Sequence, residues 1–320
     1  MNCGRYSKVS GGDLIGILTN NECIVNAQRA GLAIPAFNIP YLPMMEPVVR
    51  ALRDTGSFGF ITVARLEWVK FQARSLGAIL NEYERIKDYR FTRLHLDHVP
   101  VIDEDNLRVD YEGVIREAIE MGYASVMVDG SRLSLDDNIS ATRKIVQIAH
   151  ARSVAVEGEL GTVLGHEAGP IRSYEQLYAT GNGFTDPEEA RRFVKETGVD
   201  WLSVAVGSIH GAISDVLRHN KKVEARLNID HLKRIHEAVG IPLVLHGGTG
   251  IKKECVLAAI KHGFAKVNIG TAIRQPYENG LKESSAAAQK AVYAATVKVL
   301  TEDLEVRGSH QQINPEDWLA

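Results

Sequence analysis

Eight short apolar runs that alternate with helical patterns constrain the fold of this chain most. The runs cover residues 34–37, 58–63, 91–96, 124–128, 153–157, 201–206, 241–245 and 265–269. Most are followed by segments with apolar residues at three- and four-residue spacing, as in amphipathic helices: 42–55, 111–121, 135–151, 187–197, 229–239 and 252–262. Near-continuous apolar strands are typical of a parallel sheet covered on both faces. The pattern predicts an α/β fold, a (β/α)8 TIM barrel spanning residues 1–320 as a single domain. A doubly wound open sheet is the competing fold, but no GxGxxG fingerprint follows the first strand.

Composition and charge narrow the class of function. The 320 residues are 45% hydrophobic and 24% charged, with a formal net charge of -3. This balance gives no basic excess for binding nucleic acid or a membrane surface. No signal peptide or membrane-spanning run is recognisable. Cys3, Cys23 and Cys255 form neither a disulfide framework nor a CxxC knuckle, so we expect a cytoplasmic protein.

Residues 275–304 read as a long helix within a C-terminal helical tail, 275–320. We expect this tail to pack on the barrel or between the subunits of a homodimer or homotetramer.

Polar and ionisable residues collect where the predicted strands end. Seven of the eight strands end in, or are followed closely by, a residue that can bind a metal or donate a hydrogen bond: Asn38, Asp97, His98, Asp129, Ser131, Glu157, Glu159, His210, His246 and Asn268. In a barrel of this kind the carboxyl ends of the strands and the loops after them form the active site. We therefore predict that the active site lies at the end of the barrel where the strands finish.

Three histidines in this set suggest a metal. His98, His210 and His246 follow the third, sixth and seventh strands, and three imidazoles can hold Zn²⁺ with one coordination position open. A single histidine in such a place would more often be structural. Asp97 precedes His98, and strand alternation places His95 on the same face as Asp97, as a supporting residue.

Glycine-containing loops after the last two strands suggest an anion site. Gly247, Gly248 and Thr249 follow the seventh strand, and Gly270 and Thr271 follow the eighth. These loops form the usual phosphate site of TIM barrels, because small residues let backbone N–H groups approach an oxyanion. The longer connections, 99–110 and 160–186, are either lids beside the site or plain surface insertions.

Six motifs resemble the class II, metal-dependent ketose-bisphosphate aldolases, the family of fructose- and tagatose-bisphosphate aldolases. The resemblance runs from about residue 33 to residue 274. The motifs are HLDH at 95–98, SVMVDGSRLSLDDNI at 125–139, VEGELGTVLGHE at 156–167, VAVGSIHG at 204–211, LVLHGGTGI at 243–251 and KVNIGT at 266–271.

This resemblance implies a role for each matching residue. Catalytic Zn²⁺ would be held by His98, His210 and His246, and Asp97 would be the acid/base for the hydroxyl at the cleaved bond. A second divalent or monovalent cation could accompany the zinc. The other implied residues are Asp129 and Glu159 at an alternative metal position, Glu167 as a base in a mobile loop, Asn268 at the enediolate, and Asn38, Gly211, Gly247, Gly248, Thr249, Gly270 and Thr271 around the sugar phosphate.

The implied chemistry is physically coherent. Retro-aldol cleavage leaves a carbanion next to a carbonyl, and a Lewis acid can stabilise the resulting enediolate. A carboxylate removes the hydroxyl proton as the aldehyde leaves, so no lysine Schiff base is needed. Lys266, the only obvious lysine in a strand, then reads as structural.

The chain departs from the family where the aldehyde portion would bind. Residues 37–41 read FNIPY where the family usually has FNxNN, and residues 64–67 read ARLE in place of a small polar loop. Thr271 is followed by Ala272 where the family commonly has an acid, and residues 99–110 form an acidic insertion. We therefore expect a ketose 1-phosphate other than fructose 1,6-bisphosphate, with Arg65 and Arg132 near an anionic tail such as a carboxylate, sulfonate or phosphate. Two alternatives are surface ion pairs for both arginines, and a fructose- or tagatose-bisphosphate aldolase proper.

Two other functions use the same metal site. A zinc hydrolase on a TIM barrel also needs a metal and an acid, but it does not need the glycine loops or Asn268. A metal-binding subunit without turnover is permitted by the altered residues, although the intact Asp97 argues against it.

Overall fold

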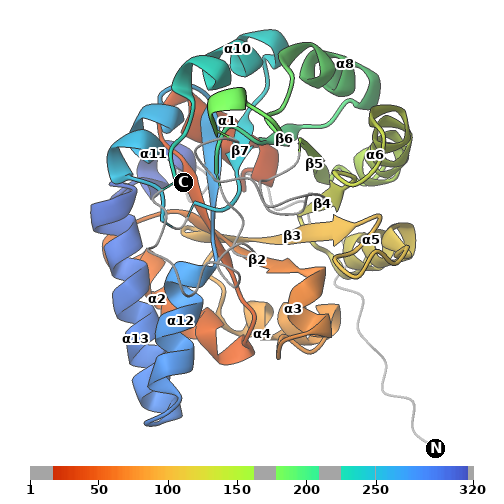
Figure 1. Cartoon of the computed structure of the whole chain (residues 1–320). Coiled ribbons are helices and arrows are strands. Elements are labelled where there is room, and N and C mark those ends of the chain that lie inside the picture. Colours follow the sequence, from red (N-terminus) through yellow and green to blue (C-terminus); the bar gives the residue numbers. More distant parts are fainter. Residues whose placement is uncertain (1–16, 162–177, 209–224, 249, 316–320) are drawn as a thin grey trace, which may run out of the picture.

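Eight parallel strands close into a barrel, so the predicted fold class is confirmed. The computed structural model describes residues 17–161, 178–208, 225–248 and 250–315. The strands pair in chain order and β1 closes on β8. Figure 1 shows the strands inside a ring of helices. Their bounds are β1 Ile34–Asn38, β2 Gly59–Ala64, β3 Thr92–Pro100, β4 Ser125–Asp129, β5 Ala155–Leu160, β6 Trp201–Val204, β7 Leu243–Leu245 and β8 Phe264–Ile269. Each strand overlaps one of the predicted apolar runs.

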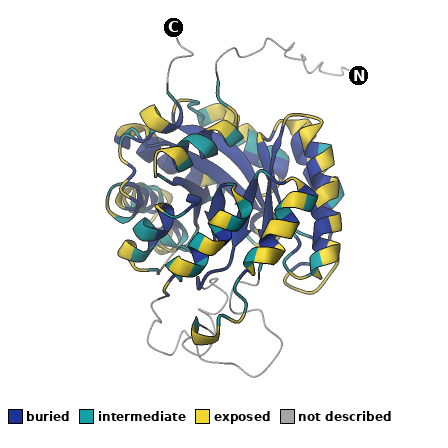
Figure 2. Cartoon of the chain, turned by 90° about the horizontal axis from the view of Figure 1, so that it is seen from above, coloured by how far each residue is buried: buried dark blue, intermediate teal, exposed yellow. Residues whose placement is uncertain are grey.

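Helices surround the barrel, with their buried faces toward the strands and their exposed faces outward (Figure 2). Asp186 shows how one of them starts: its side chain accepts hydrogen bonds from the backbone N–H groups of Glu188 and Glu189, with Pro187 at the first helical position. The helices are α1 Asn20–Arg29, η1 Leu42–Met44, α2 Met45–Thr55, α3 Arg65–Val69, α4 Leu76–Ile86, α5 Tyr111–Met121, α6 Leu135–His150, α8 Pro187–Thr197, α10 Ile229–Val239, α11 Lys253–Ile260, α12 Thr271–Gly280, α13 Ser285–Lys298, η2 Val299–Asp303 and α14 His310–Ile313. Among the described residues, no helix combines the length and the apolar character needed to cross a bilayer.

The N-terminal end of the barrel is closed by α1, a helix that the sequence patterns did not predict. Thr19 and Glu22 form a capping box at its start. Its residues Cys23, Ile24 and Ala27 are fully buried in one apolar cluster with the first residues of several strands. Access to the barrel interior is therefore left to the opposite end, where the strands finish.

The barrel interior changes from apolar to polar along its axis. Near the α1 end, the rings of Phe60 and Trp201 pack with centroids 6.0 Å apart. His95 lies against both rings, at 6.1 Å and 5.7 Å, and is fully buried. Glu157 and Lys266 are also fully buried. Polar groups that are buried away from water need hydrogen-bonding partners. The partners of these three residues link them to the candidate site.

Strand β3 corrects one expectation. The sequence predicts a strand ending at residue 96, but β3 continues to Pro100. The pairing with β4 shifts register between Leu96 and Val99, and His98 in this interval has φ 21°, a value that side-chain-bearing residues seldom adopt. A bulge of this kind lets a strand continue while one side chain is re-aimed.

The C-terminal tail is helical as expected, but the prediction of one helix over 275–304 is wrong. Two helices, α12 and α13, are separated by residues 281–284, and Ser284 caps the second by accepting from the backbone N–H of Ala287. Helix α13 packs against α2 and α12. The break between α12 and α13 was not predicted, because the apolar spacing continues across it and a single serine cap is a weak signal inside an alanine-rich stretch.

Candidate active site

The bulge in β3 brings Asp97 and His98 to the same site. Regular alternation would send them to opposite faces of the sheet. Ligand atoms of Asp97, His98 and His246 nevertheless all lie within 4.8 Å of one another. The imidazole rings of His98 and His246 have centroids 4.4 Å apart. Asp97 and His98 therefore converge because of a bulge within the strand, which continues to Pro100.

A second group with metal-ligand spacing shares His98. Ligand atoms of His98, Asp129 and Glu159 also lie within 4.8 Å of one another. The Nδ1 atom of His98 is 3.3 Å from Asp129 Oδ2 and 3.4 Å from Glu159 Oε2. Two adjacent metal-capable groups, one richer in imidazole and one richer in carboxylate, therefore meet at His98.

The electrostatics of the two imidazoles fit a bound cation. Burial by itself would lower the pKa of His98, but the charges of Asp97 and Glu159 raise it to about 10. Burial and His98 oppose protonation of His246, yet its contacts with Glu157 and Glu159 raise its pKa. Two imidazolium rings this close repel each other, whereas one divalent cation would satisfy the same carboxylates without two protons. Imidazole nitrogens with carboxylate oxygens are also the donor set that zinc prefers.

Asp97 is held by amide donors. Its Oδ2 accepts hydrogen bonds from Nδ2 of Asn38 at 2.8 Å and Nδ2 of Asn268 at 3.0 Å. Burial by itself would raise the pKa of Asp97, but the Lys266 ammonium and the imidazoles hold it well below its usual range. The acid is therefore ionised and fixed in position at the bulge of β3.

The candidate phosphate residues lie at the same end of the barrel. Gly270 and Thr271 follow β8, and Thr271 is the first residue of α12, so the helix N-terminus faces that end. A Cβ on Gly248 would come within 2.9 Å of Val267 Cγ1, so a larger residue would not fit without a shift. Gly247 has φ 69°, in the left-handed region that favours glycine.

Four residues expected at the site lie outside the described residues. They are Glu167, His210, Gly211 and Thr249. Their expected roles, including the third imidazole for zinc, remain predictions.

Arg65 and Arg132 meet at the insertion that follows β3. Arg65 lies 3.5 Å from Asp103 Oδ2, and Arg132 donates to the backbone oxygen of Asp103 at 2.9 Å and to Asn106 Oδ1 at 3.0 Å. Both guanidinium groups therefore help to fix the acidic loop. About a fifth of the Arg65 side chain, 22%, is exposed.

The sequence patterns missed one acid near the site, Glu67. It is buried on α3, and its Oε2 accepts a hydrogen bond from the backbone N–H of Ala64 at 2.8 Å. Burial raises its pKa to about 8, and the nearby Asp97 carboxylate acts in the same direction. The signal was the acid in ARLE, where the resemblance predicts a small polar loop.

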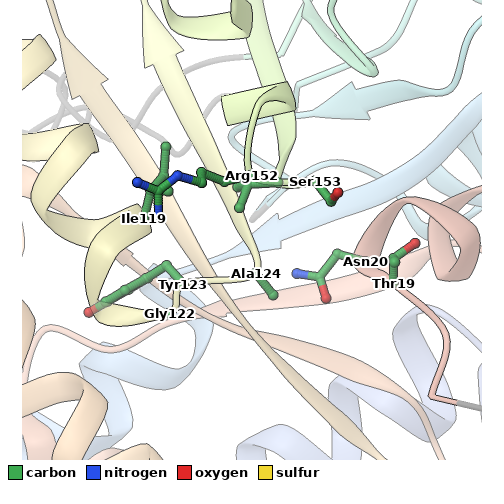
Figure 3. Close-up of a pocket in the computed structure, with 9 residues that line it drawn as sticks. Thr19, Asn20, Ile119, Gly122, Tyr123, Ala124, Arg152 and Ser153 are labelled. Atoms are coloured by element: carbon green, nitrogen blue, oxygen red, sulfur yellow. The ribbon is translucent and has the colours of Figure 1, made fainter. Parts of the chain in front are cut away.

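A cavity at the other end of the barrel lies away from this chemistry. It has a volume of about 360 Å³ and is lined by residues such as Asn20, Tyr123 and Arg152, as Figure 3 shows. Its lining includes none of the histidines or carboxylates described above. The residue chemistry, and not the cavity, thus identifies the candidate active site.

Comparison with known proteins agrees with this geometry. The family model described as "Fructose-bisphosphate aldolase class-II" matches residues 19–312. Fructose-bisphosphate aldolase from Staphylococcus aureus is 30% identical over 303 residues, covering 93% of this chain and 91% of the relative. The relative from Geobacillus stearothermophilus, with the same description, is 30% identical over 276 residues, 84% of this chain and 86% of its own.

A solved structure extends the comparison to the fold. The YdjI aldolase from Escherichia coli K12 superposes with a TM-score of 0.72 at 26% identity, covering 91% of this chain and 98% of its own. The match of the family model over most of the chain, together with the converging Asp97, His98 and His246, leads to one conclusion. The chain belongs to the class II fructose-bisphosphate aldolase family and is an aldolase, a carbon–carbon lyase.

Proposed function

We propose that this protein is a zinc-dependent aldolase that reversibly cleaves a ketose 1-phosphate or ketose bisphosphate to dihydroxyacetone phosphate and an aldehyde. The observation that carries the proposal is the grouping of Asp97, His98 and His246 within 4.8 Å at the carboxyl ends of the strands. Such a group supports the proposal because it offers two imidazole ligands for a divalent metal with a carboxylate beside them.

The proposal assigns the metal to imidazoles from three strands. His98, His246 and His210 would hold Zn²⁺, and Asp129 and Glu159 would offer an adjacent position for it or for a second cation. Bound zinc would act as a Lewis acid toward the ketose carbonyl. The contacts of His98 with Asp129 and Glu159 support a site in which one ligand serves two neighbouring positions.

We assign the two proton transfers of the reaction to carboxylates. Asp97, ionised and held by Asn38 and Asn268, takes the proton from the hydroxyl at the bond that breaks. The pair of electrons from that bond stays on the dihydroxyacetone phosphate portion as the aldehyde leaves. Glu167 would return a proton to this carbon, and Asn268 would steady the oxygen beside it.

The phosphate end would bind where the last two strands finish. Backbone N–H groups there and the N-terminus of α12 favour an anion. The proposed cradle consists of Gly211, Gly247, Gly248, Thr249, Gly270 and Thr271.

The aldehyde portion of the substrate would bind to the residues in which this chain departs from its family. We propose that Arg65 and Arg132 favour an anionic tail, in the form of a carboxylate, sulfonate or phosphate. The partial exposure of Arg65 supports this, since among the described residues its guanidinium pairs with one acid, at 3.5 Å, and a guanidinium carries five N–H donors.

We also propose a homodimer or homotetramer that forms through the C-terminal helices. Helix α13 rests on α2 and α12 with one side, and its alanine-rich remainder includes exposed Ala286 and Ala294. Light scattering on the purified chain tests this part of the proposal.

One incubation tests the main proposal. The zinc-loaded protein is mixed with dihydroxyacetone phosphate and a panel of aldehydes, and the product is identified by mass. Formation of a carbon–carbon bond supports an aldolase, while hydrolysis of phosphate or amide substrates without condensation supports a zinc hydrolase. Stoichiometric zinc without either activity supports a non-catalytic subunit and overturns the proposal.

A further inference from the structure

Below the candidate metal site, the described part of the barrel interior holds three ionisable side chains that the proposed chemistry does not use. His95, Glu157 and Lys266 are all fully buried. Burying an ion pair in a dry core is costly, and apolar residues of similar size are often at least as stabilising. Such a group calls for a reason beyond the stability of the barrel.

The ammonium of Lys266 makes two hydrogen bonds and one longer ion pair. It donates to Glu157 Oε2 at 2.6 Å and to His95 Nε2 at 3.3 Å, and lies 3.6 Å from Asp97 Oδ1. These three contacts hold the side chain in one position. Lys266 thus joins the acid proposed for catalysis to a second acid deeper in the barrel.

The second acid, Glu157, contacts a proposed zinc ligand. Its Oε1 is 3.0 Å from His246 Nε2. Its other oxygen, Oε2, accepts a hydrogen bond from the Lys266 ammonium at 2.6 Å. A carboxylate paired with an ammonium accepts hydrogen bonds, so Nε2 of His246 is the donor. The other ring nitrogen, Nδ1, faces Glu159 Oε2 at 3.7 Å, on the side of the metal-capable group.

Resting on the function proposed above, we propose that Glu157 is a positioning residue for the metal site and that Lys266 holds it in place. Glu157 keeps the proton of His246 on Nε2, so that Nδ1 presents its lone pair to the cation. Lys266 supplies the countercharge that holds the Glu157 carboxylate and, through its ion pair with Asp97, connects the metal site to the proposed acid/base.

The lower end of the network explains the orientation of Lys266. Burial and Lys266 lower the pKa of His95 to about 3, so His95 is neutral. With Nε2 accepting from Lys266, its Nδ1 donates to Ser125 Oγ at 2.8 Å, and Ser125 also accepts from Asn20 of α1 at 2.6 Å. The chain of hydrogen bonds therefore runs from α1, which closes the barrel, to the imidazole at the site.

Zinc affinity of the folded, full-length protein tests the proposal, because it does not depend on turnover. The apo protein is titrated with zinc in competition with a chromophoric chelator, for the wild type and for Glu157→Gln, Glu157→Asp and Lys266→Met. We expect Glu157→Gln to raise the zinc dissociation constant about 10- to 100-fold, the usual cost of losing a carboxylate that orients a metal-bound histidine. The double variant Glu157→Gln/Lys266→Met should be no weaker than Glu157→Gln alone, since both residues act through the same histidine.

Glu157→Asp keeps the test decisive if Glu157→Gln fails to fold. It keeps the charge opposite Lys266 but withdraws the carboxylate from His246, so the protein should fold while zinc still binds more weakly. The absorption spectrum of the cobalt-substituted protein should shift in the same variants, because the geometry of the imidazole changes.

Asn314→Ala is the matched control. Asn314 is buried at the opposite end of the barrel, where it donates to the backbone oxygens of Tyr89 and Arg90. This variant should lower the melting temperature without changing the zinc dissociation constant. If the Glu157 variants behave like Asn314→Ala, their role is only structural and the inference is wrong. If the wild type itself binds no zinc and forms no aldol product, the proposed function fails instead.

Discussion

Nδ2 of Asn268 lies 3.1 Å from Oδ1 and 3.0 Å from Oδ2 of Asp97, so a single amide group spans both oxygens of the carboxylate. Asn38 adds a third contact, from β1. The neighbouring strands β8 and β1 thus supply the amides that hold the acid of β3, which lies beyond β2 in the barrel. The acid can therefore accept a proton in a fixed geometry. A group held in this way should matter far more for the rate of the reaction than for the stability of the fold.

We expect Asp97→Ala to lower kcat by about 10²- to 10⁴-fold, the usual contribution of a positioned acid or base. Zinc should stay bound, because the imidazoles remain. Steady-state cleavage assays, together with metal analysis of the same sample, check both statements.

Asp186→Ala is the control for this variant. It removes the cap of α8, costs about 1 kcal/mol of stability, and should leave kcat unchanged. Full activity in Asp97→Ala would show that another group performs the proton transfer.

Removal of the metal should abolish activity and destabilise the fold. Without a cation, the carboxylates around His98 lose the charge that holds them together, so the apo protein should melt at a lower temperature. Zinc at one hundred times its dissociation constant should restore about 2.7 kcal/mol of stability. Calorimetry before chelation, after chelation and after zinc is added back measures this difference.

Activity that survives chelation would contradict the metal-dependent reaction. Trapping with borohydride would then test for a Schiff base on Lys266. We expect no such adduct, because Lys266 is fully buried and its Nζ is bonded to Glu157.

The fold was predictable because the eight strands are short, apolar and separated by helices with clear start signals such as Asp186-Pro187. The bulge at His98 was not, because a shift of register depends on pairing with β4 and leaves no local trace in the sequence. For the same reason, Lys266 could be read as structural but not as the partner of Glu157. These residues are 109 positions apart, and only closure of the barrel brings them together.

Gly207 should be intolerant of substitution. It lies just after β6 with φ 115°, and a Cβ there would come within 2.5 Å of the backbone oxygen of Arg226. We expect Gly207→Ala to cost at least about 1–3 kcal/mol, because the strained backbone has to move. Urea unfolding measures the loss.

Gly31→Ala provides the comparison for this variant. Gly31 also has positive φ, at 66°, but a Cβ there would meet nothing within 4 Å. A loss in Gly207→Ala no larger than in Gly31→Ala would show that the close approach to Arg226 does not constrain this loop.

Two variants should change the activity toward anionic aldehydes in opposite directions. Loss of the Arg65 guanidinium should lower this activity, and loss of the Asp103 charge should raise it. Arg65→Ala removes the partly exposed guanidinium and should lower kcat/KM for aldehydes with an anionic tail by about 10- to 100-fold, the value of one or two charged hydrogen bonds. Asp103→Asn keeps the side-chain oxygen that accepts from the backbone N–H groups of Asp105 and Leu107, but removes the negative charge 3.5 Å from Arg65. It should therefore raise kcat/KM for the same substrates.

Neutral aldehydes of equal length should be affected by neither substitution. Arg191→Ala, which breaks an exposed ion pair with Glu188 on α8, is the matched control. A panel that varies only the terminal group of the aldehyde separates the outcomes. If fructose 1,6-bisphosphate is the best substrate by a wide margin and Arg65→Ala leaves the ranking unchanged, the two arginines serve only to anchor the insertion, and the aldehyde portion is read by other residues.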